Sequence, residues 1–364
     1  MRRILHILSS LDCGGVENLL YNYYTNIKNE EIVFDFIVHG KKSGFLESKF
    51  EKLGSKIYHV TPKKKSIIKN IFEVKKIIKN GRYDIVHCHQ NFSSFTSLFL
   101  AFIHNVPIRI IHAHGYKKIN TKKEKIKTIL LRFINSLFSN YYFACSNDAG
   151  NWLYGKKWKS NNHYFLMKNA INTKKFKFDN NIRLKYRKEF NIENDCKILI
   201  HIGRFSQEKN HQFLLEIISK IENAKLFLIG NGDLEKEIKN KVKIRNITEK
   251  VYFLGNREDV NNLLFMADIF LFPSKNEGFG LCALESQCAG LKTIISENIP
   301  REIILTDLVN VVSIDSLNEW IECINKETKE YNRKHYFEII NSSCYNIEKA
   351  TKEYINYIKS IKGK

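Results

Sequence analysis

The stretch FPSKNEGFGLCALESQCAG, residues 272–290, holds two glutamates, Glu277 and Glu285, on either side of a glycine-rich turn. The run IFLFPS, at 269–274, is typical of a short buried strand, and the apolar residues after the turn recur at helical spacing. A strand, a turn and a helix in this order predict one unit of a parallel sheet. The free N–H groups that begin such a helix favour phosphate oxygens, with the two carboxylates flanking them.

The same order of strand-like run and helix-like segment repeats along the chain. Most of the short apolar runs are followed by Gly, Asn or Ser and then by a segment with helical spacing. The runs lie at 2–9, 33–40, 83–90, 108–115 and 141–146 in the first half, and at 197–205, 224–232, 251–256, 269–274 and 292–297 in the second. This repetition predicts two doubly wound α/β domains with parallel strands, and 292–297 as the last strand.

The length of 364 residues suits two domains of roughly 150 to 200 residues each. We predict an N-terminal domain at 1–166, a polar interdomain connection at 167–195, and a C-terminal domain at 196–345. The last segment, 346–364, has a helical period and could cross back to the first domain. Doubly wound sheets bind ligands at the carboxyl ends of their strands, so we expect both halves to face a shared cleft.

The chain is strongly basic, with 59 Lys and Arg against 38 Asp and Glu and a formal net charge of +21. This balance predicts attraction to anions, although a genome-wide bias toward Lys, Asn and Ile explains part of it equally well. The cysteines form no C-x-x-C pair, and no window approaches about 18 uncharged apolar residues. We therefore expect a cytoplasmic protein with reduced cysteines and no membrane span.

One basic segment, YKKINTKKEKIKTILLRFINSLF at 116–138, has the pattern of an amphipathic helix. Its lysines gather toward the start. One stripe holds the apolar side chains Ile126, Ile129, Leu130, Phe133, Ile134 and Leu137. Two interpretations remain open: the stripe packs on the sheet of its own domain, or it lies on the inner leaflet of the cell membrane as a peripheral element.

A pair of cations follows the first strand of the second half, in HIGRFSQEKNH at 201–211. Gly203 permits a tight turn, Arg204 offers a rigid fork of donors, and Lys209 adds a compact charge near the start of the next helix. Both cations can therefore converge on one anion at the end of the strand. Two fixed cations can neutralise a diphosphate without a metal ion, although a solvated basic turn has the same pattern.

The loop SSLDCGGVENLL, at 9–20, places Gly14 and Gly15 between a strand and a helix, where the backbone can approach a phosphate or a sugar. It lacks the G-x-G-x-x-G spacing of a dinucleotide site, and the GNG at 230–232 has no third glycine in register. Nicotinamide and flavin cofactors are therefore disfavoured. The chain also contains no G-x-x-x-x-G-K-[ST] motif and no Asp-x-Asp clamp for a metal-bound sugar nucleotide.

Histidines gather at two strand ends, as His87 and His89 in HCHQ and as His112 and His114 in HAHG. Strand alternation places both members of each pair on one face, so that one can face the cleft while its neighbour lies deeper. A zinc site needs three or four ligands in a geometry that these pairs alone do not indicate, and we predict no metal. A neutral histidine at such an edge can instead donate to a sugar hydroxyl.

Taken together, these motifs resemble glycosyltransferase family 4, retaining enzymes of the GT-B fold with two Rossmann-like domains. The resemblance rests on Gly14–Gly15, HAHG, CSNDAG, NAINTKKF, GRFSQEKN and NEGFGLCALES, in that order, and covers roughly residues 3 to 320. The local sequences GGVENLLYNYY, FDFIVHG, YDIVHCH and KNHQFLLEI are most similar to those of the bacterial branch of the family that builds exopolysaccharide, capsule or O-antigen.

The resemblance implies a role for each matching residue. Diphosphate contacts are implied for Arg204 and Lys209, beside Gly203, and ribose contacts for Glu285. The donor sugar would be contacted by Glu277, by backbone amides of Gly278, Phe279, Gly280 and Leu281, and by His114. The nucleobase would lie near Leu254, Gly255 and Asn256, and Gly14 and Gly15 would approach the diphosphate or acceptor from the other domain. The glycine that follows His114 favours it over His112.

The implied reaction is a metal-independent hexosyl transfer, of the EC 2.4 type, with no cofactor. The donor is a nucleotide-diphosphate sugar, which we expect to be UDP-linked, and the acceptor is a hydroxyl of a surface glycan carried on a polyprenyl diphosphate. Two alternatives are a sugar-nucleotide epimerase of the same shape and a polyanion-binding protein without catalysis. No nucleic-acid-binding motif is present, which disfavours nucleic acid as a partner. The sequence names neither the sugar nor the linkage.

Overall fold

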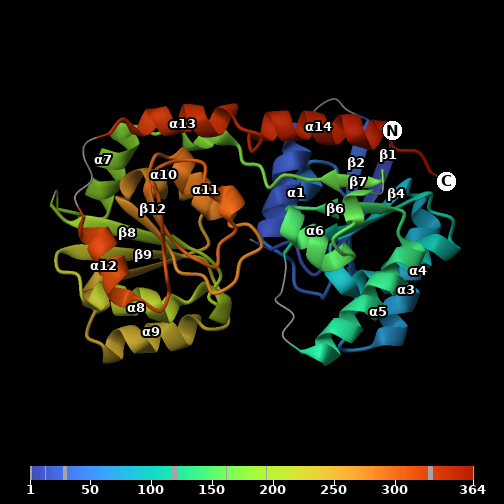
Figure 1. Ribbon diagram of the computed structural model, residues 1–364, viewed down its shortest axis with the longest axis horizontal. Helices are drawn as coiled ribbons and strands as arrows, with labels where there is room; N and C mark the ends of the chain where they lie inside the picture. The colour runs from blue at the N-terminus through green and yellow to red at the C-terminus, as the bar shows by residue number, and fades with distance from the viewer. Residues whose placement is uncertain are drawn as a thin grey trace. The chain divides into compact units, whose positions relative to one another are not determined.

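The computed structural model describes residues 2–12, 14–27, 31–115, 121–160, 162–193, 195–326 and 331–363 (Figure 1). The chain divides into two compact units. Unit 1 is Met1–Ala170 with Ile347–Lys364, and unit 2 is Ile171–Asn346.

The described part of unit 1 contains a sheet of seven parallel strands in the order β3-β2-β1-β4-β5-β6-β7. Its strands are β1 (Arg2–Leu8), β2 (Ile32–His39), β3 (Ile57–Val60), β4 (Ile85–Cys88), β5 (Ile108–Ala113), β6 (Tyr141–Ala144) and β7 (Tyr164–Leu166). Its helices are α1 (Gly15–Asn26), α2 (Glu47–Lys52), α3 (Ile67–Gly81), α4 (Phe95–Ile103), α5 (Lys122–Phe138), α6 (Asn147–Tyr154) and α14 (Ile347–Ser360), with 3₁₀ turns η1 (Asn91–Ser94) and η2 (Trp158–Ser160).

Helices cover both faces of this sheet, as the doubly wound pattern predicts. One face packs on α1, α2 and α14 through a core that includes Phe34, Phe143 and Tyr354. The other face packs on α3, α4 and α6 through Val86, Leu98 and other apolar side chains. The strand order reverses between β1 and β4, so the loops after these two strands diverge at the carboxyl edge, which is where ligands of such sheets bind.

The described part of unit 2 contains a sheet of six parallel strands in the order β10-β9-β8-β11-β12-β13. Its strands are β8 (Lys197–Ile202), β9 (Ala224–Ile229), β10 (Val251–Gly255), β11 (Ile269–Phe272), β12 (Lys292–Ser296) and β13 (Val309–Val312). Its helices are α7 (Asn180–Glu189), α8 (His211–Ser219), α9 (Glu235–Ile244), α10 (Val260–Met266), α11 (Leu281–Cys288), α12 (Leu317–Asn325) and α13 (Arg333–Ser342). The 3₁₀ turns are η3 (Thr173–Phe176), η4 (Gln207–Lys209), η5 (Thr248–Lys250) and η6 (Arg301–Ile303).

The switch point of unit 2 lies between β8 and β11, the two strands that lead into the predicted cation and glutamate motifs. The prediction of two doubly wound parallel sheets is confirmed. The prediction that 292–297 is the last strand is wrong, because β13 follows it at the sheet edge. Three of the four residues of β13 are only half-buried, so its apolar pattern is weak.

The segment expected to connect the domains, 167–195, divides between the two units at residue 170. Its second part forms η3 and α7, and Arg183 of α7 donates to Asp268 Oδ1 at 2.6 Å. The C-terminal helix α14 belongs to unit 1, where Tyr354 packs edge-on to Tyr23 of α1 with ring centroids 5.5 Å apart.

Helix α5 does not pack its apolar stripe on the sheet, so that interpretation of 116–138 is wrong. Ile126, Ile129, Leu130, Phe133 and Leu137 are 53–68% exposed. The buried residues of α5 are instead the polar Thr128 and Asn135, which follow the opposite stripe. The first residues of the predicted helix, 116–120, lie outside the described residues. None of the described helices combines the length and the hydropathy of a membrane span.

Candidate functional site

The turn after β8 approaches its neighbours too closely for any residue but glycine at position 203. A Cβ there would lie 2.7 Å from His201 Nε2 and 3.3 Å from Lys209 Cδ. The Gly203 N–H donates to Ile229 O of β9 at 2.9 Å. The sequence therefore fixes the course of the chain toward Arg204 and Lys209 by close packing.

The ends of β9 and β10 lie against this turn. A Cβ on Gly230 would come within 2.3 Å of Gly203 O, and its φ of +126° suits only glycine. The Gly230 N–H donates to Gly255 O at 2.8 Å. The half-buried residues Leu254, Gly255 and Asn256 thus belong to the same carboxyl edge as Gly203. The GNG at 230–232 serves this backbone packing.

The turn after β11 ends at Gly280, which caps α11 with a φ of +93°. A Cβ there would lie 2.9 Å from Phe272 Cε1. The Phe279 side chain is buried in the core, so only its backbone is available to a ligand. Because α11 begins at Leu281, its first N–H groups lack a carbonyl one turn earlier and mark the expected position for phosphate oxygens.

The two motifs of unit 2 meet in an ion pair between Lys209 Nζ and Glu277 Oε2. The ammonium also lies 4.7 Å from the centroid of the Phe272 ring. Burial is the largest single influence and acts to lower the pKa of Lys209, but the charge and hydrogen bond of Glu277, together with Cys282 and Glu208, hold that pKa above its ordinary value. Lys209 is therefore a fixed cation whose charge Glu277 offsets while no other anion is bound.

A second contact ties the two loops together, since the Lys275 N–H donates to Glu208 O at 2.7 Å. Arg204 is exposed on the same turn as Lys209. Its charge, after the hydrogen bonds from Ser206 and the backbone, helps to hold the pKa of Glu208 below its ordinary value. The structure thus brings Lys209 and Glu277 into contact, with Arg204 exposed on the same turn as Lys209.

Glu285 lies on the first half of α11, half-buried, with no salt bridge within the described residues. Burial raises the pKa of its carboxyl to about 8, and the charge of Lys175 opposes that rise. Lys175 belongs to η3, which packs against α11. Glu285 is therefore close to its protonation midpoint at slightly alkaline pH, and a ligand that donates hydrogen bonds would favour the carboxylate.

In unit 1, Gly14 caps α1, and its carbonyl accepts from Asn18 Nδ2 at 3.0 Å. A Cβ on Gly15 would have no described atom within 4 Å. Packing within the described part of unit 1 therefore gives no reason for glycine at position 15.

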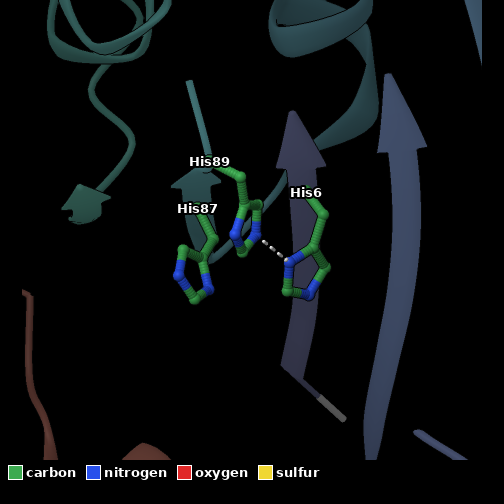
Figure 2. A group of neighbouring side chains, drawn as sticks. All are labelled: His6, His87 and His89. Atoms are coloured by element: carbon green, nitrogen blue, oxygen red, sulfur yellow. Dashed lines mark hydrogen bonds between the residues drawn. The ribbon is translucent and has the colours of Figure 1, made fainter. Parts of the chain in front are cut away.

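Five histidines, in three neighbouring strands or directly after them, lie together at the carboxyl edge of this sheet, and all but the half-buried His114 are buried. His6 Nδ1 lies 2.9 Å from His89 Nε2, and His89 Nδ1 lies 2.7 Å from His114 Nε2 (Figure 2 shows the first contact). A second pair joins His87 Nε2 to His112 Nδ1 at 3.1 Å. Burial lowers the pKa of every one of them, and their mutual repulsion lowers those of all but His114 further. The network therefore consists of neutral imidazoles.

The network orders the two members of each predicted pair by depth. His112 is fully buried, whereas His114 is half-buried. His114 is the last member of the series of hydrogen-bonded histidines His6–His89–His114. The sequence-based preference for His114 thus falls on the accessible residue. The sequence indicates His6 only as part of a strand-like run. The register between β1 and β4 pairs His6 with His87, which places the two side chains on one face of the sheet.

Two groups in the network have the spacing of metal ligands, His6 with His87 and His89, and His89 with His112 and His114. Within each group the candidate nitrogens lie within 4.8 Å of one another. The His87 and His89 rings stack, 4.2 Å apart at 28°. The pairs His6–His89, His89–His114 and His87–His112 each lie at hydrogen-bonding distance.

Sequence reasoning missed two neighbours of the predicted site. Phe272 places its ring against the Lys209 ammonium, and Lys175 acts on Glu285. Each is an ordinary residue of a strand or turn in the sequence. Their roles depend on contacts between remote segments, which no local pattern records.

Comparison with known proteins identifies the class. Residues 13–175 match the family described as Glycosyltransferase Family 4, and residues 182–337 match the family described as Glycosyl transferases group 1. The chain belongs to glycosyltransferase family 4, and the predicted resemblance is confirmed.

Particular relatives align over most of the chain. A capsular polysaccharide biosynthesis glycosyltransferase, CapH of Staphylococcus aureus, is 27% identical and covers 97% of each chain. The UDP-Gal:α-D-GlcNAc-diphosphoundecaprenol α-1,3-galactosyltransferase of Escherichia coli is 23% identical, over 81% of this chain and 79% of its own. The crystal structure of Anabaena HepE in complex with UDP and glucose superposes with a TM-score of 0.81 at 15% identity, covering 99% and 100% of the two chains. The predicted GT-B fold is thereby confirmed.

Proposed function

We propose that this glycosyltransferase moves a hexosyl unit from a UDP-linked sugar to a hydroxyl of a surface glycan carried on a polyprenyl diphosphate. The names of the relatives support each part. CapH acts in capsular polysaccharide biosynthesis, the E. coli relative uses UDP-Gal and a diphosphoundecaprenol-linked acceptor, and the HepE crystal contains UDP and glucose. On this proposal the chain works in the cytoplasm, at the inner face of the cell membrane.

The observation that carries the proposal is the Lys209–Glu277 ion pair at the switch point of unit 2, beside the start of α11. When the donor binds, its diphosphate takes over Lys209 from Glu277, with Arg204 and the N–H groups of 278–281 as further donors. Glu277 is then free to accept hydrogen bonds from the hydroxyls of the donor sugar. Glu285 accepts from the ribose, and Leu254 to Asn256 flank the nucleobase.

In the proposed reaction, the bond between the anomeric carbon and the diphosphate oxygen breaks, and the acceptor oxygen bonds to the same face of that carbon. The acceptor proton passes to the departing phosphate oxygen, so configuration is retained without a nucleophile from the protein. Lys209, Arg204 and the start of α11 stabilise the charge that develops on the diphosphate more strongly than they stabilise the ground state. This placement of cations supports transfer without a metal ion.

A screen of nucleotide sugars tests the proposal. The full chain is incubated with each sugar and EDTA, with and without a polyprenyl-diphosphate-linked acceptor, and both the melting temperature and the product are measured. We expect UDP and one or more UDP-sugars to raise the melting temperature and sugar transfer to require the acceptor. Epimerisation of the donor without acceptor, or no thermal shift with any nucleotide sugar, would contradict the proposal.

A further inference from the structure

A histidine stands where β8 and β11 separate at the switch point of unit 2. The last pair of residues between these strands in the described chain is Ile200 with Phe270. One residue further on, the side chain of His201 bridges the gap, with its Nδ1 2.8 Å from Leu271 O. His201 therefore joins the two strands that lead to the two turns of the candidate site.

The contact with Leu271 decides which nitrogen of this imidazole carries the proton. A carbonyl oxygen only accepts, so His201 Nδ1 is the donor. The side chain is fully buried, and this burial, together with the charges of His211 and Lys209, lowers the pKa of His201 well below its ordinary value. The ring is therefore neutral, with its proton on Nδ1 and a lone pair on Nε2.

The Nε2 lone pair of His201 has no hydrogen-bond donor within the described residues. A buried acceptor without a donor destabilises a fold, and an apolar side chain at this strand position would avoid that loss. A histidine here therefore calls for a specific reason. The surroundings of Nε2 indicate which donor can reach it.

Nε2 faces the turn that carries Lys209. A Cβ at Gly203 would lie 2.7 Å from His201 Nε2 and 3.3 Å from Lys209 Cδ, so both atoms lie close to one point. The Phe272 ring borders the same space, with its centroid 6.0 Å from that of the His201 ring and 4.7 Å from Lys209 Nζ. Because Nζ lies further along the same flexible stem as Cδ, rotation of the side chain can bring the ammonium to Nε2.

The Lys209 ammonium has N–H groups available for a second acceptor. It carries three N–H groups, and within the described residues its hydrogen-bond partner is Glu277. On the proposed function, the diphosphate of the donor takes over the contact that Glu277 holds in the unliganded chain. A second carboxylate beside the ammonium would offset the charge that the diphosphate needs. A neutral imidazole nitrogen can hold the ammonium in place and leave that charge intact.

We infer that His201 is a positioning residue for Lys209, and that its Nε2 accepts a hydrogen bond from the Lys209 ammonium when the donor diphosphate is bound. Its Nδ1–H holds β11 beside β8 at the same time, so that one ring relates Lys209 to the turn before α11. The role rests on the proposed function for the diphosphate alone, since the contact with Leu271 requires no ligand.

His211 is the other side chain that could supply a donor to Nε2. Its ring lies edge-on to that of His201, with centroids 4.8 Å apart, and stacks on Phe205 at 4.0 Å. Both nitrogens of His211 lack a hydrogen-bond partner within the described residues, so neither bonds to His201. The variant His211→Phe keeps an aromatic ring against Phe205 and removes both nitrogens. It is therefore the matched control.

Nitrogen spectra of the full chain, labelled with ¹⁵N at histidine, test the inference with UDP as the probe. The variant His201→Gln identifies the His201 resonances. We expect the Nδ1–H form of His201, and the resonance of its bare Nε2 should move toward that of a hydrogen-bonded nitrogen when UDP is added. The same movement is expected in His211→Phe. In Lys209→Met, at a UDP concentration that saturates this variant, the resonance should keep its unliganded position.

Three results of these spectra would overturn the inference. They are an Nε2–H form of His201, a movement of the Nε2 resonance in Lys209→Met as large as in the unchanged chain, and loss of the movement in His211→Phe. Normal UDP binding without any movement would refute the role of His201 alone. A chain that binds no UDP would refute the proposed function, and with it the contact that depends on the diphosphate.

UDP affinity and melting temperature distinguish positioning from a merely structural role. His201→Leu is close in volume but has no lone pair, and we expect its UDP affinity and its turnover each to fall about tenfold. Without UDP its melting temperature should stay within about three degrees of the unchanged chain, because loss of the bond to Leu271 is offset by removal of the unpaired acceptor. His201→Gln, whose amide oxygen can accept in place of Nε2, should bind UDP within about threefold of the unchanged chain. A lower melting temperature in His201→Leu with unchanged UDP affinity would mean that the role is structural.

A double variant tests whether His201 acts through Lys209. In the Lys209→Met background, His201→Leu should lower the UDP affinity by less than about twofold, because both changes remove the same contact. Calorimetric titration with UDP measures all four chains of this cycle. A loss in the double variant equal to the product of the two single losses would show that the residues act independently, and the inference would be wrong.

Discussion

The carboxyl edges of the two sheets differ in charge. In unit 2 the edge holds a lysine, an arginine and two glutamates, with Lys209 and Glu277 already paired. In unit 1 the corresponding edge holds five neutral histidines and two glycines. The same doubly wound architecture thus presents fixed charge on one unit and uncharged hydrogen-bonding groups on the other. On the proposed function, the charged edge of unit 2 binds the diphosphate of the donor, and the uncharged edge of unit 1 offers hydrogen bonds to hydroxyl groups.

The largest effect is expected from removing the fixed cation. Lys209→Ala should lower turnover by about two to three orders of magnitude, because the diphosphate loses its charge-assisted contact as it departs. Steady-state kinetics with the donor found by the screen measure this loss. Lys236→Ala, at an exposed lysine of the same unit, is the control. Near-normal turnover in Lys209→Ala would contradict the proposal that the charged edge of unit 2 stabilises the departing diphosphate.

Glu277→Gln separates the two roles of the ion pair. Its amide still reaches the donor sugar but no longer offsets Lys209. We expect turnover to fall about 10- to 100-fold while UDP, which has no sugar, binds as tightly as before or more tightly. Calorimetric titration with UDP and turnover with the UDP-sugar report the two effects. A large loss of UDP affinity in this variant would mean that Glu277 serves the nucleotide instead.

Because of Glu285, the stability of unit 2 should depend on pH. The pKa of Glu285 is raised from 4.5 to about 8 by burial, so the protonated carboxyl stabilises the fold fully below about pH 4.5, and this stabilisation is lost as the pH rises through about 8. Relative to the unchanged chain, Glu285→Gln should therefore gain melting temperature between pH 6 and 9.

The titration of the Glu285 carboxyl also predicts how the affinity for UDP changes with pH. Ribose hydroxyls donate to a carboxylate better than to a carboxylic acid, so UDP affinity of the unchanged chain should rise by about three- to tenfold as the pH passes 8. In Glu285→Gln the affinity should be lower and independent of pH over this range. An affinity that falls with rising pH in the unchanged chain would contradict the ribose role.

The smallest effect is expected from chelation. EDTA should change the turnover by less than about twofold and the melting temperature by less than about one degree. The reason is that Lys209, Arg204 and the start of α11 supply the positive charge that a metal ion would otherwise provide. A melting temperature that falls with EDTA and recovers with Zn²⁺ would indicate a metal ion in the histidine network of unit 1. The edge of unit 1 would then carry charge, as the edge of unit 2 does.

The repeating strand-and-helix order was readable from the sequence because buried parallel strands are continuous apolar runs. It predicted both sheets and located Lys209, Glu277 and Glu285 at the ends of β8 and β11. The edge strands β3, β7 and β13 were missed, since most of their residues are only partly buried. Helix α5 was recognised as amphipathic, but its periodicity could not tell whether the apolar stripe faced the protein. That direction depends on hydrogen bonds of Asn135 and Arg132 with distant segments.

A crystal structure of the full chain with bound UDP tests the central claim most directly. The account predicts phosphate oxygens within hydrogen-bonding distance of Lys209 Nζ, the Arg204 guanidinium and the N–H groups of 278–281, with the Lys209–Glu277 contact broken or lengthened. Phosphates bound elsewhere, with that ion pair intact, would contradict it.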